Sequence, residues 1–225
     1  MSLQENLNQV EKRITTACLR TGRQREEVTL VAVTKTQPVE ILQGAYDLGI
    51  RDFGENKVQE LLAKKELLPP DIRWHLIGHL QSNKAKSIAP FIHSVHSIDS
   101  LGVAVELSNR ATRYSRAIDV LLEINVAGEA TKEGVAIEEA ENLLYAIREQ
   151  ATALSVRGLM TVAPFLSEAD EVRPVFQKLR NLANNLELHD LSMGMTNDFE
   201  VAIEEGATII RIGSALFGKR QKNNS

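Results

Sequence analysis

The chain has 225 residues, and its 26 lysines and arginines against 30 aspartates and glutamates give a formal net charge of −4. This balance disfavours nucleic-acid binding, which normally needs a basic excess, and a single cysteine excludes an internal disulfide framework. No apolar run reaches the roughly 18 residues of a membrane helix, and the polar N-terminus resembles no targeting signal. We therefore expect a globular, cytoplasmic protein with neither a nucleic-acid nor a membrane partner.

Short β-branched segments alternate with longer amphipathic segments along the chain. The first helix is predicted over residues 3–21, and Gly22 ends it. A strand buried on both faces follows over residues 28–34. Pro38 suits the first position of the next helix, which Gly49 ends. Further strands are expected at 51–54, 74–77, 94–98, 119–126, 156–160, 191–194 and 209–213.

In the segments between these strands, apolar residues recur at helical spacing, which predicts helices. One helix runs to Glu66 and stops before Pro69. Another begins at the capping residues Ser167 and Asp170 and reaches Leu186, and Pro174 within it predicts a delayed start. The remaining helical segments are 83–88, 99–113, 137–150 and 197–205.

About eight strands that alternate with helices favour a parallel sheet with right-handed crossovers. Eight such units form a closed (β/α)8 TIM barrel, for which about 200 residues suffice. An open doubly wound sheet usually has a glycine-rich first turn, whereas the first strand here ends in TKTQP (34–38). We predict the α/β class and one domain over residues 1–225, with residues 3–21 as an extra N-terminal helix. Residues 218–225 are expected to form a flexible tail.

Lys35 directly follows the first buried strand. Barrel enzymes place their chemistry at the C-terminal ends of the strands. A lysine that is partly removed from water at such a place loses its proton more readily, so its free amine can attack a carbonyl carbon. The alternative is a lysine whose side chain only extends from the strand end into solvent.

Two segments near the C-terminus are suited to an anion. LSMGMTND (191–198) and IIRIGSALFG (209–218) each run from a strand into a turn and a helix start. Backbone N–H groups at such turns attract phosphate, which barrels often bind after their last two strands. The candidate donors are Ser192, Gly213 and Ser214. Ordinary helix capping is the alternative.

Arg211 lies in a strand among isoleucines. A buried guanidinium keeps its charge and needs an acceptor. We expect an Asp or Glu partner, and a ligand atom with a lone pair is the alternative.

His75 and His79 are four residues apart but lie on a strand and the following loop, with Gly78 between them. His93 and His96 lack a nearby cysteine or carboxylate at metal-ligand spacing. In each case a hydrogen-bonded histidine, and no metal site, is predicted.

Taken together, seven segments resemble the pyridoxal phosphate homeostasis proteins, the YggS/PROSC family. One position departs from the family, because EIN (123–125) stands where QVN or QIN is frequent. The matching segments are AVTKTQP (32–38), FGENKVQE (53–60), WHLIGHLQSNK (74–84), HSIDS (96–100), GLM (158–160), LSMGMTND (191–198) and RIGSALFG (211–218).

The resemblance implies one barrel, similar to the N-terminal domain of alanine racemase, that binds pyridoxal 5′-phosphate. Lys35 would carry the Schiff base, and Arg211 would face the pyridine nitrogen. The resemblance also places Asn56 beside the ring and adds His75 and Met160. The residues implied at the phosphate are Ser192, Met193, Gly213 and Ser214.

The resemblance further implies that the protein holds pyridoxal phosphate as a lysine aldimine and maintains its intracellular level without clear catalytic activity. A charged Arg211 would keep the ring nitrogen unprotonated, which makes the ring a weaker electron sink. A racemase also needs a second acid or base, and the chain ends seven residues after Gly218.

Two other functions remain open. One is a minimal amino-acid racemase or lyase that uses the same cofactor. The other is an aldolase in which Lys35 forms a Schiff base with a phosphosugar and no cofactor takes part. A role as a partner-regulated interaction protein is compatible with the first prediction, but the sequence indicates no recipient of the cofactor.

Overall fold

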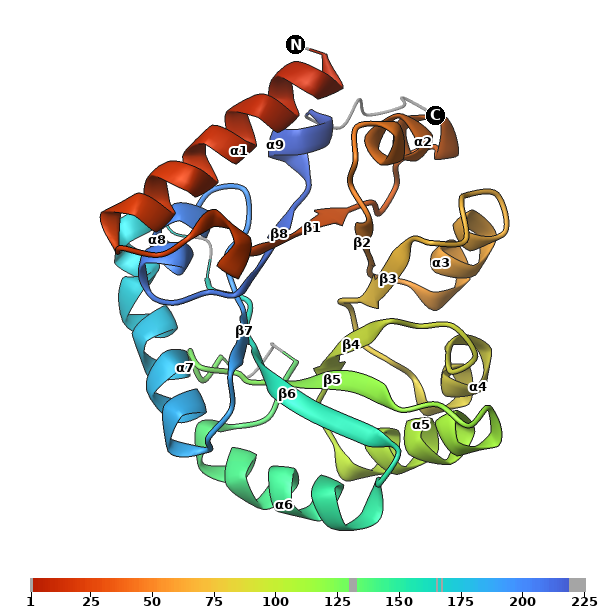
Figure 1. The fold of residues 1–225 in the computed structure, drawn as a ribbon. Coiled ribbons are helices and arrows are strands. Elements are labelled where there is room, and N and C mark those ends of the chain that lie inside the picture. The colour runs from red at the N-terminus through yellow and green to blue at the C-terminus, as the bar shows by residue number, and fades with distance from the viewer. Residues whose placement is uncertain (1, 130–132, 165, 167, 219–225) are drawn as a thin grey trace.

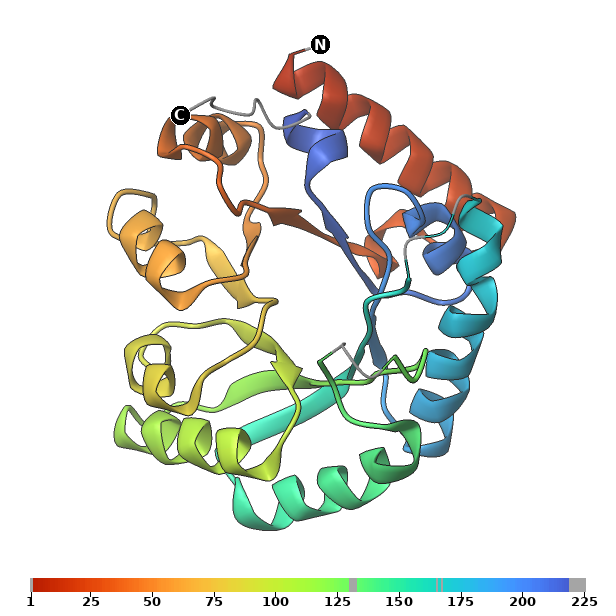
Figure 2. The ribbon, with the colours of Figure 1, turned by 180° about the vertical axis from the view of Figure 1, so that it is seen from behind.

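Eight parallel strands form one closed barrel in chain order, surrounded by helices (Figure 1). This computed structural model describes residues 2–129, 133–164, 166 and 168–218. The arrangement confirms the predicted (β/α)8 barrel, and Figure 2 shows the same ring from behind. The strands are β1 (Thr29–Val33), β2 (Asp52–Glu55), β3 (Arg73–Leu76), β4 (Ser94–Ile98), β5 (Ile118–Glu123), β6 (Leu154–Met160), β7 (Asp190–Ser192) and β8 (Ile209–Ile212).

The helices cover the outside of the barrel, because their apolar faces and the outward-facing strand residues form one continuous core. None of the described helices is long and apolar enough to cross a membrane. The α-helices of the described residues are α1 (Leu3–Arg20), α2 (Val39–Asp47), α3 (Val58–Lys65), α4 (Ala85–Ile88), α5 (Leu101–Arg113), α6 (Ala140–Gln150), α7 (Arg173–Asn185), α8 (Phe199–Glu204) and α9 (Ser214–Phe217).

Closure of the barrel makes the first strand and the last strand neighbours. β1 pairs with β2 on one side and with β8 on the other, with Val31 opposite Arg211 and Ala32 opposite Ile212. The segment that follows β1 therefore lies beside the segment that follows β8. This closure is what makes a site between residues near 35 and residues near 211 possible.

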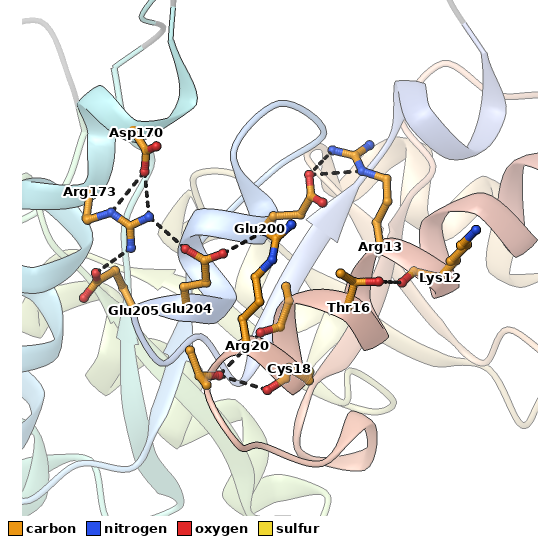
Figure 3. A network of polar contacts seen from close by, with 12 residues as sticks. Lys12, Arg13, Thr16, Cys18, Arg20, Asp170, Arg173, Glu200, Glu204 and Glu205 are labelled. Carbon is orange, nitrogen blue, oxygen red and sulfur yellow. Dashed lines mark hydrogen bonds and ion pairs between the residues drawn. The ribbon is translucent and has the colours of Figure 1, made fainter.

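The predicted extra N-terminal helix is present as α1. Its buried face includes Ile14 and Cys18, which belong to the core cluster. Two ion pairs join α1 to α8, as Figure 3 shows: Arg13 to Glu200 at 2.6 Å and Arg20 to Glu204 at 3.0 Å. Close to the N-terminus of α1, Asn6 Nδ2 donates a hydrogen bond to the carbonyl oxygen of Leu216 in α9 at 2.9 Å.

Several predicted boundaries shift, for local reasons. Pro38 lies one residue before α2 with an extended ψ of 154°, so it caps the helix instead of starting it. β5 ends at Glu123, not at Val126, because the chain leaves the barrel there and Val135 returns to bond the carbonyl oxygen of Glu123. β7 ends at Ser192, before Gly194 with its φ of +93°.

The helix with the internal proline starts late, as predicted. A 3₁₀ turn over Ala169–Val172 precedes α7, and Pro174 lies in the first turn of α7. The predicted capping residue Ser167 lies outside the described residues. Of the predicted tail, 218–225, only Gly218 is described, where it follows α9 with a φ of +84°.

Candidate functional site

The C-terminal ends of β1 and β8 open into one cavity of about 450 Å³. Lys35, which is half-buried, follows β1, and Arg211 lies within β8, one residue before the strand ends. Gly213 and Ser214 form the start of α9. These four predicted site residues line the same cavity together with Val33, Gln37, Met195, Thr196 and Gly218.

Thr34, just before Lys35, is held by a buried ion pair. Its carbonyl oxygen accepts a hydrogen bond from Lys64 Nζ at 2.7 Å, and its hydroxyl donates to Glu55 Oε1 at 2.6 Å. Lys64 and Glu55 are themselves 2.6 Å apart. Burial raises the pKa of Glu55, against the opposing hydrogen bonds from Lys64 and Thr34. The ion pair therefore fixes the backbone where β1 ends.

Thr36, just after Lys35, adopts a strained backbone conformation. Its φ of +64° lies in the left-handed region, which is unfavourable for a β-branched residue. The Thr36 N–H donates to Glu60 Oε1 at 2.5 Å, and Lys64 Nζ contacts the same oxygen at 2.7 Å. Lys64 thus joins the residues on both sides of Lys35. Strain of this kind costs about 1–3 kcal/mol and persists only where the surroundings hold it.

We call this group the Lys64 clamp, and sequence reasoning missed it. Its members are Thr34, Thr36, Glu55, Glu60 and Lys64. The signal that could have found it is the i, i+4 spacing of Glu60 and Lys64, next to a glutamate inside a buried strand. Such a glutamate needs a cationic partner.

Arg211 is 3% exposed and is held by neutral oxygens. Its Nη1 donates to the carbonyl oxygen and to Oγ of Ser192, both at 2.7 Å, and its Nη2 donates to the carbonyl oxygen of Thr161 at 2.9 Å. The predicted Asp or Glu partner is wrong, because no hydrogen bond or ion pair between described residues joins Arg211 to a carboxylate. Burial lowers the pKa of Arg211 to about 10, while the charges of Glu123 and Asp198 oppose the shift.

The turns after β7 and β8 meet at Thr196. Its Oγ1 accepts hydrogen bonds from the Ser214 hydroxyl and from the backbone N–H of Ala215, each at 3.2 Å. Gly194 makes the first turn possible, because a Cβ there would lie 2.5 Å from that of Ala202. The two turns are thus in contact with each other, and Thr196, which joins them, also lines the cavity that contains Lys35.

Three predicted phosphate or ring residues lie deeper in the protein. Ser192 is fully buried, and its Oγ faces the barrel interior between Arg211 and His96. Met160 is buried at the end of β6. Met193 points the other way, into the core between the strands and the helices. The structure does not bring these side chains into the cavity that contains Lys35.

Asn56 lines a second cavity at the same end of the barrel. This cavity has a volume of about 650 Å³ and includes His79 and Glu133. Asn56 Oδ1 is buried and has no hydrogen-bond partner among the described residues. An amide oxygen left in this state is suited to a ligand that donates a hydrogen bond.

Glu123, at the end of β5, faces the barrel interior. Asp119 and Leu121, which alternate with it on the strand, line a cavity at the opposite end of the barrel, so all three share one face. Glu123 Oε2 has no hydrogen-bond partner among the described residues. Burial, followed by the charges of Glu133 and Asp99, raises the pKa of Glu123 to about 7.

His75 lies toward the N-terminal end of the barrel, far from the predicted ring position. It lines the opposite cavity, of about 570 Å³, and hydrogen bonds to Asp52 Oδ1 and His96 Nε2, each at 3.0 Å. His93, predicted to lack a carboxylate partner at metal-ligand spacing in the sequence, has one in the fold, because Asp52, His75 and His93 place ligand atoms within 4.8 Å of one another. These residues come from different segments of the chain, which sequence spacing does not reveal. Two hydrogen bonds from the Arg73 guanidinium to Asp52 oppose a cation there.

Comparison with known sequences gives a consistent set of relatives. Residues 3–221 match the family described as alanine racemase, N-terminal domain. A protein from Aquifex aeolicus named pyridoxal phosphate homeostasis protein is 45% identical, over 98% of this chain and 100% of the relative. A protein of the same name from Escherichia coli is 39% identical, over 96% and 95%.

Solved structures agree. PipY of Synechococcus elongatus, with PLP bound, superposes with a TM-score of 0.80 at 35% identity, covering 93% of this chain and 100% of PipY. An alanine racemase from Clostridium difficile shares the fold, with a TM-score of 0.73 at 14% identity, and the match covers 99% of this chain but 58% of the racemase. On the strength of these matches, the chain belongs to the family of pyridoxal phosphate homeostasis proteins, within the wider group that has the alanine racemase N-terminal domain.

Proposed function

We propose that this protein binds pyridoxal 5′-phosphate reversibly in the cavity at the ends of β1 and β8, and thereby helps to keep the free cofactor in balance. One observation carries the proposal: Lys35, Arg211 and the Ser214 turn line the same cavity. They offer an amine for an aldehyde, a cation for a ring nitrogen and N–H and O–H donors for a phosphate. PipY, similar to this chain, has PLP bound.

Lys35 would hold the cofactor covalently. Its uncharged Nζ would supply the amine that condenses with the aldehyde of the cofactor with release of one water molecule, and hydrolysis would reverse the linkage. The Lys64 clamp supports this role, because it fixes the backbone on both sides of Lys35. Because the backbone around Lys35 is already fixed, less conformational entropy is lost when its side chain binds the cofactor.

Arg211 would donate a hydrogen bond to the lone pair of the pyridine nitrogen. Since the guanidinium keeps its proton, the ring nitrogen then stays unprotonated, and the ring accepts electrons less well. This favours storage over carbanion chemistry on amino acids. We therefore propose that the protein is not an amino-acid racemase or lyase, and that it acts as a carrier or regulator of the cofactor inside the cell.

The visible absorption spectrum tests the proposal. Purified protein incubated with pyridoxal phosphate and then dialysed is expected to be yellow, and Lys35→Ala is expected to lose this absorbance. Lys178→Ala, which removes an exposed lysine on α7, serves as the matched control. A Lys35→Ala variant that folds and keeps the wild-type spectrum would overturn the role of Lys35.

Two further outcomes distinguish the alternative functions. Turnover of an amino acid by protein freed of contaminating racemase would support an enzyme. A colourless protein in which borohydride traps a phosphosugar on Lys35 would support an aldolase.

A further inference from the structure

A continuous chain of hydrogen bonds crosses the barrel interior from Arg211 at the mouth to the opposite end. Arg211 Nη1 contacts Ser192 Oγ at 2.7 Å, and Ser192 Oγ contacts His96 Nδ1 at 3.0 Å. His96 Nε2 contacts His75 Nδ1 at 3.0 Å, and His75 Nε2 contacts Asp52 Oδ1 at 3.0 Å. We call these five residues, which come from five different strands, the histidine chain.

The two ends of the histidine chain determine where each proton lies. A guanidinium can only donate and an ionised carboxylate can only accept. Ser192 Oγ therefore accepts from Arg211 and donates its own proton to His96 Nδ1. His96 then carries its proton on Nε2 and donates to His75, which donates from Nε2 to Asp52. With both imidazoles neutral, this assignment satisfies all four contacts.

The electrostatics support this assignment. His96 is fully buried, and burial together with the charges of His75 and Arg211 lowers its pKa well below the usual range, so it is neutral. Burial alone would raise the pKa of Asp52, but hydrogen bonds from His75 and Arg73 outweigh it and bring the pKa below the usual range. Asp52 is therefore the fixed acceptor at neutral pH.

The two ends of the histidine chain reach different cavities, because Arg211 lines the cavity at the mouth and Asp52 lines the one at the opposite end. Asp52 and His75 line the 570 Å³ cavity at the N-terminal ends of the strands. The exposed His93 stacks edge-on against His75, with ring centres 5.1 Å apart. The titratable and charged groups that face His75 are Asp52, Arg73, His93, His96 and Asp119, and pairs between Asp190 and its neighbours Arg157 and His189 lie on the rim.

A break in the histidine chain would reach Arg211. Removal of the Ser192 hydroxyl takes away one of the two acceptors of Arg211 Nη1. Removal of the acceptor at His75 leaves the Nε2 proton of His96 without a partner, so the tautomer that accepts from Ser192 is no longer fixed. Either change loosens the orientation of the Arg211 guanidinium at the mouth.

We propose that Ser192, His96 and His75 are positioning residues that hold the Arg211 guanidinium toward the ligand and thereby set ligand affinity at the mouth. The proposal rests on the proposed function, because pyridoxal phosphate is the ligand whose affinity is affected. It gives Ser192 and His75 a role that does not require contact with that ligand.

The affinity of the full chain for pyridoxal phosphate, measured by absorbance titration at pH 8, tests the proposal. Ser192→Ala and His75→Leu each interrupt the histidine chain, and we expect each to weaken binding at least about fivefold. His75→Asn keeps an acceptor for His96 Nε2, so it should bind nearly as tightly as wild type.

The double variant Ser192→Ala/His75→Leu should lose no more affinity than either single variant, because each interrupts the same chain. His189→Asn, which removes an exposed histidine beside Asp190 on the rim of the cavity at the N-terminal ends of the strands, should keep the wild-type affinity. Ser192→Ala and His75→Leu variants that fold and bind the cofactor as tightly as wild type would overturn the proposal.

A second measurement does not depend on the cofactor. Imidazole ¹⁵N NMR of the ligand-free full chain at pH 8 should show His96 protonated at Nε2 and unprotonated at Nδ1. The opposite tautomer would overturn the histidine chain even if pyridoxal phosphate binds. Wild-type protein that shows the expected tautomer but never binds pyridoxal phosphate would refute the proposed function and, with it, the coupling to ligand affinity.

Discussion

The two ends of the barrel differ in how their charged groups are paired. At the N-terminal end, the guanidinium of Arg73 pairs with Asp52, and Asp190 lies between Arg157 and His189. At the C-terminal mouth, Arg211 contacts only carbonyl and hydroxyl oxygens among the described residues. Neutral acceptors hold a guanidinium in place without cancelling its charge. The mouth therefore still attracts an anionic ligand. At the opposite end, the positive charges of Arg73 and Arg157 are already paired with carboxylates of the protein itself.

The Lys64 clamp is the exception at the mouth, and breaking it gives the largest expected effect. Lys64→Met leaves the buried Glu55 carboxylate without its cation, so that only the Thr34 hydroxyl still donates to it, and it removes one of the two donors to the Thr34 carbonyl oxygen. We expect the free energy of unfolding to fall by about 3 kcal/mol, measured by urea denaturation.

The exposed Lys57→Met at the start of α3 is the matched control and should have little effect. Adding Glu55→Gln to Lys64→Met should restore much of the loss, since no charge then stays buried alone. A Lys64→Met variant as stable as wild type would show that the clamp does not hold the backbone.

Glu123→Gln tests the carboxyl of Glu123 at the mouth through the pH dependence of the free energy of unfolding. The pKa of Glu123 is raised from 4.5 to about 7, so between these values the folded chain binds a proton that the unfolded chain has lost. Wild-type stability should therefore fall as pH rises from 4.5 to 7, relative to Glu123→Gln, by at most about 3 kcal/mol.

The measurement is urea denaturation of both proteins from pH 5 to pH 8, with the exposed Glu141→Gln on α6 as control. Parallel stability profiles for wild type and Glu123→Gln would contradict the burial of this carboxyl.

Ser214→Ala separates ligand affinity from stability. It removes a hydroxyl at the cavity that bonds only Thr196 in the described structure. A hydrogen bond to a charged phosphate contributes about 1.5 kcal/mol, so affinity for pyridoxal phosphate should fall roughly tenfold. The unfolding free energy of the ligand-free protein should change little. Equal losses of stability and affinity would instead indicate a structural role.

Arg73→Ala tests the N-terminal end of the barrel, where charged groups are paired, and it has the smallest expected effect on the free energy of unfolding. The Arg73 side chain is 49% exposed, so solvent screens its pair with Asp52 and the loss is about 1 kcal/mol at pH 7. Because the folded pKa of Asp52 is depressed, this stability is present above pH 3.8 and is lost as the pH falls further. Affinity for pyridoxal phosphate at pH 8 should stay unchanged, and a large loss would contradict the contrast between the two ends.

Alternation of strand and helix patterns was sufficient to predict the barrel. It was also sufficient to bring Lys35 and Arg211 together, because closure of eight strands makes the first and last strands neighbours. Lys35 and Ser214 were found by their place directly after strands. These are local signals, and a single sequence carries them.

Contacts across the interior of the barrel could not be predicted in the same way. His75 and His96 meet, and so do His96 and Ser192, 96 positions apart. Such contacts depend on the radius of the barrel and on which face of each strand points inward. An error of one residue in a strand boundary turns the side chain to the other face. Ser192 was predicted as a phosphate donor from the turn that follows it and from the family resemblance, and the contacts of its hydroxyl with Arg211 and His96 inside the barrel could not be predicted.

The seam between β1 and β8 has a consequence for synthesis. Lys35 leaves the ribosome long before Arg211 and Ser214, and Leu216 must also arrive before α1 can bond to α9. A partly translated chain thus presents the reactive amine without the groups that would retain an aldehyde beside it. Under the proposed function, a nascent chain would not retain pyridoxal phosphate until the segment that contains Arg211 and Ser214 has also been translated.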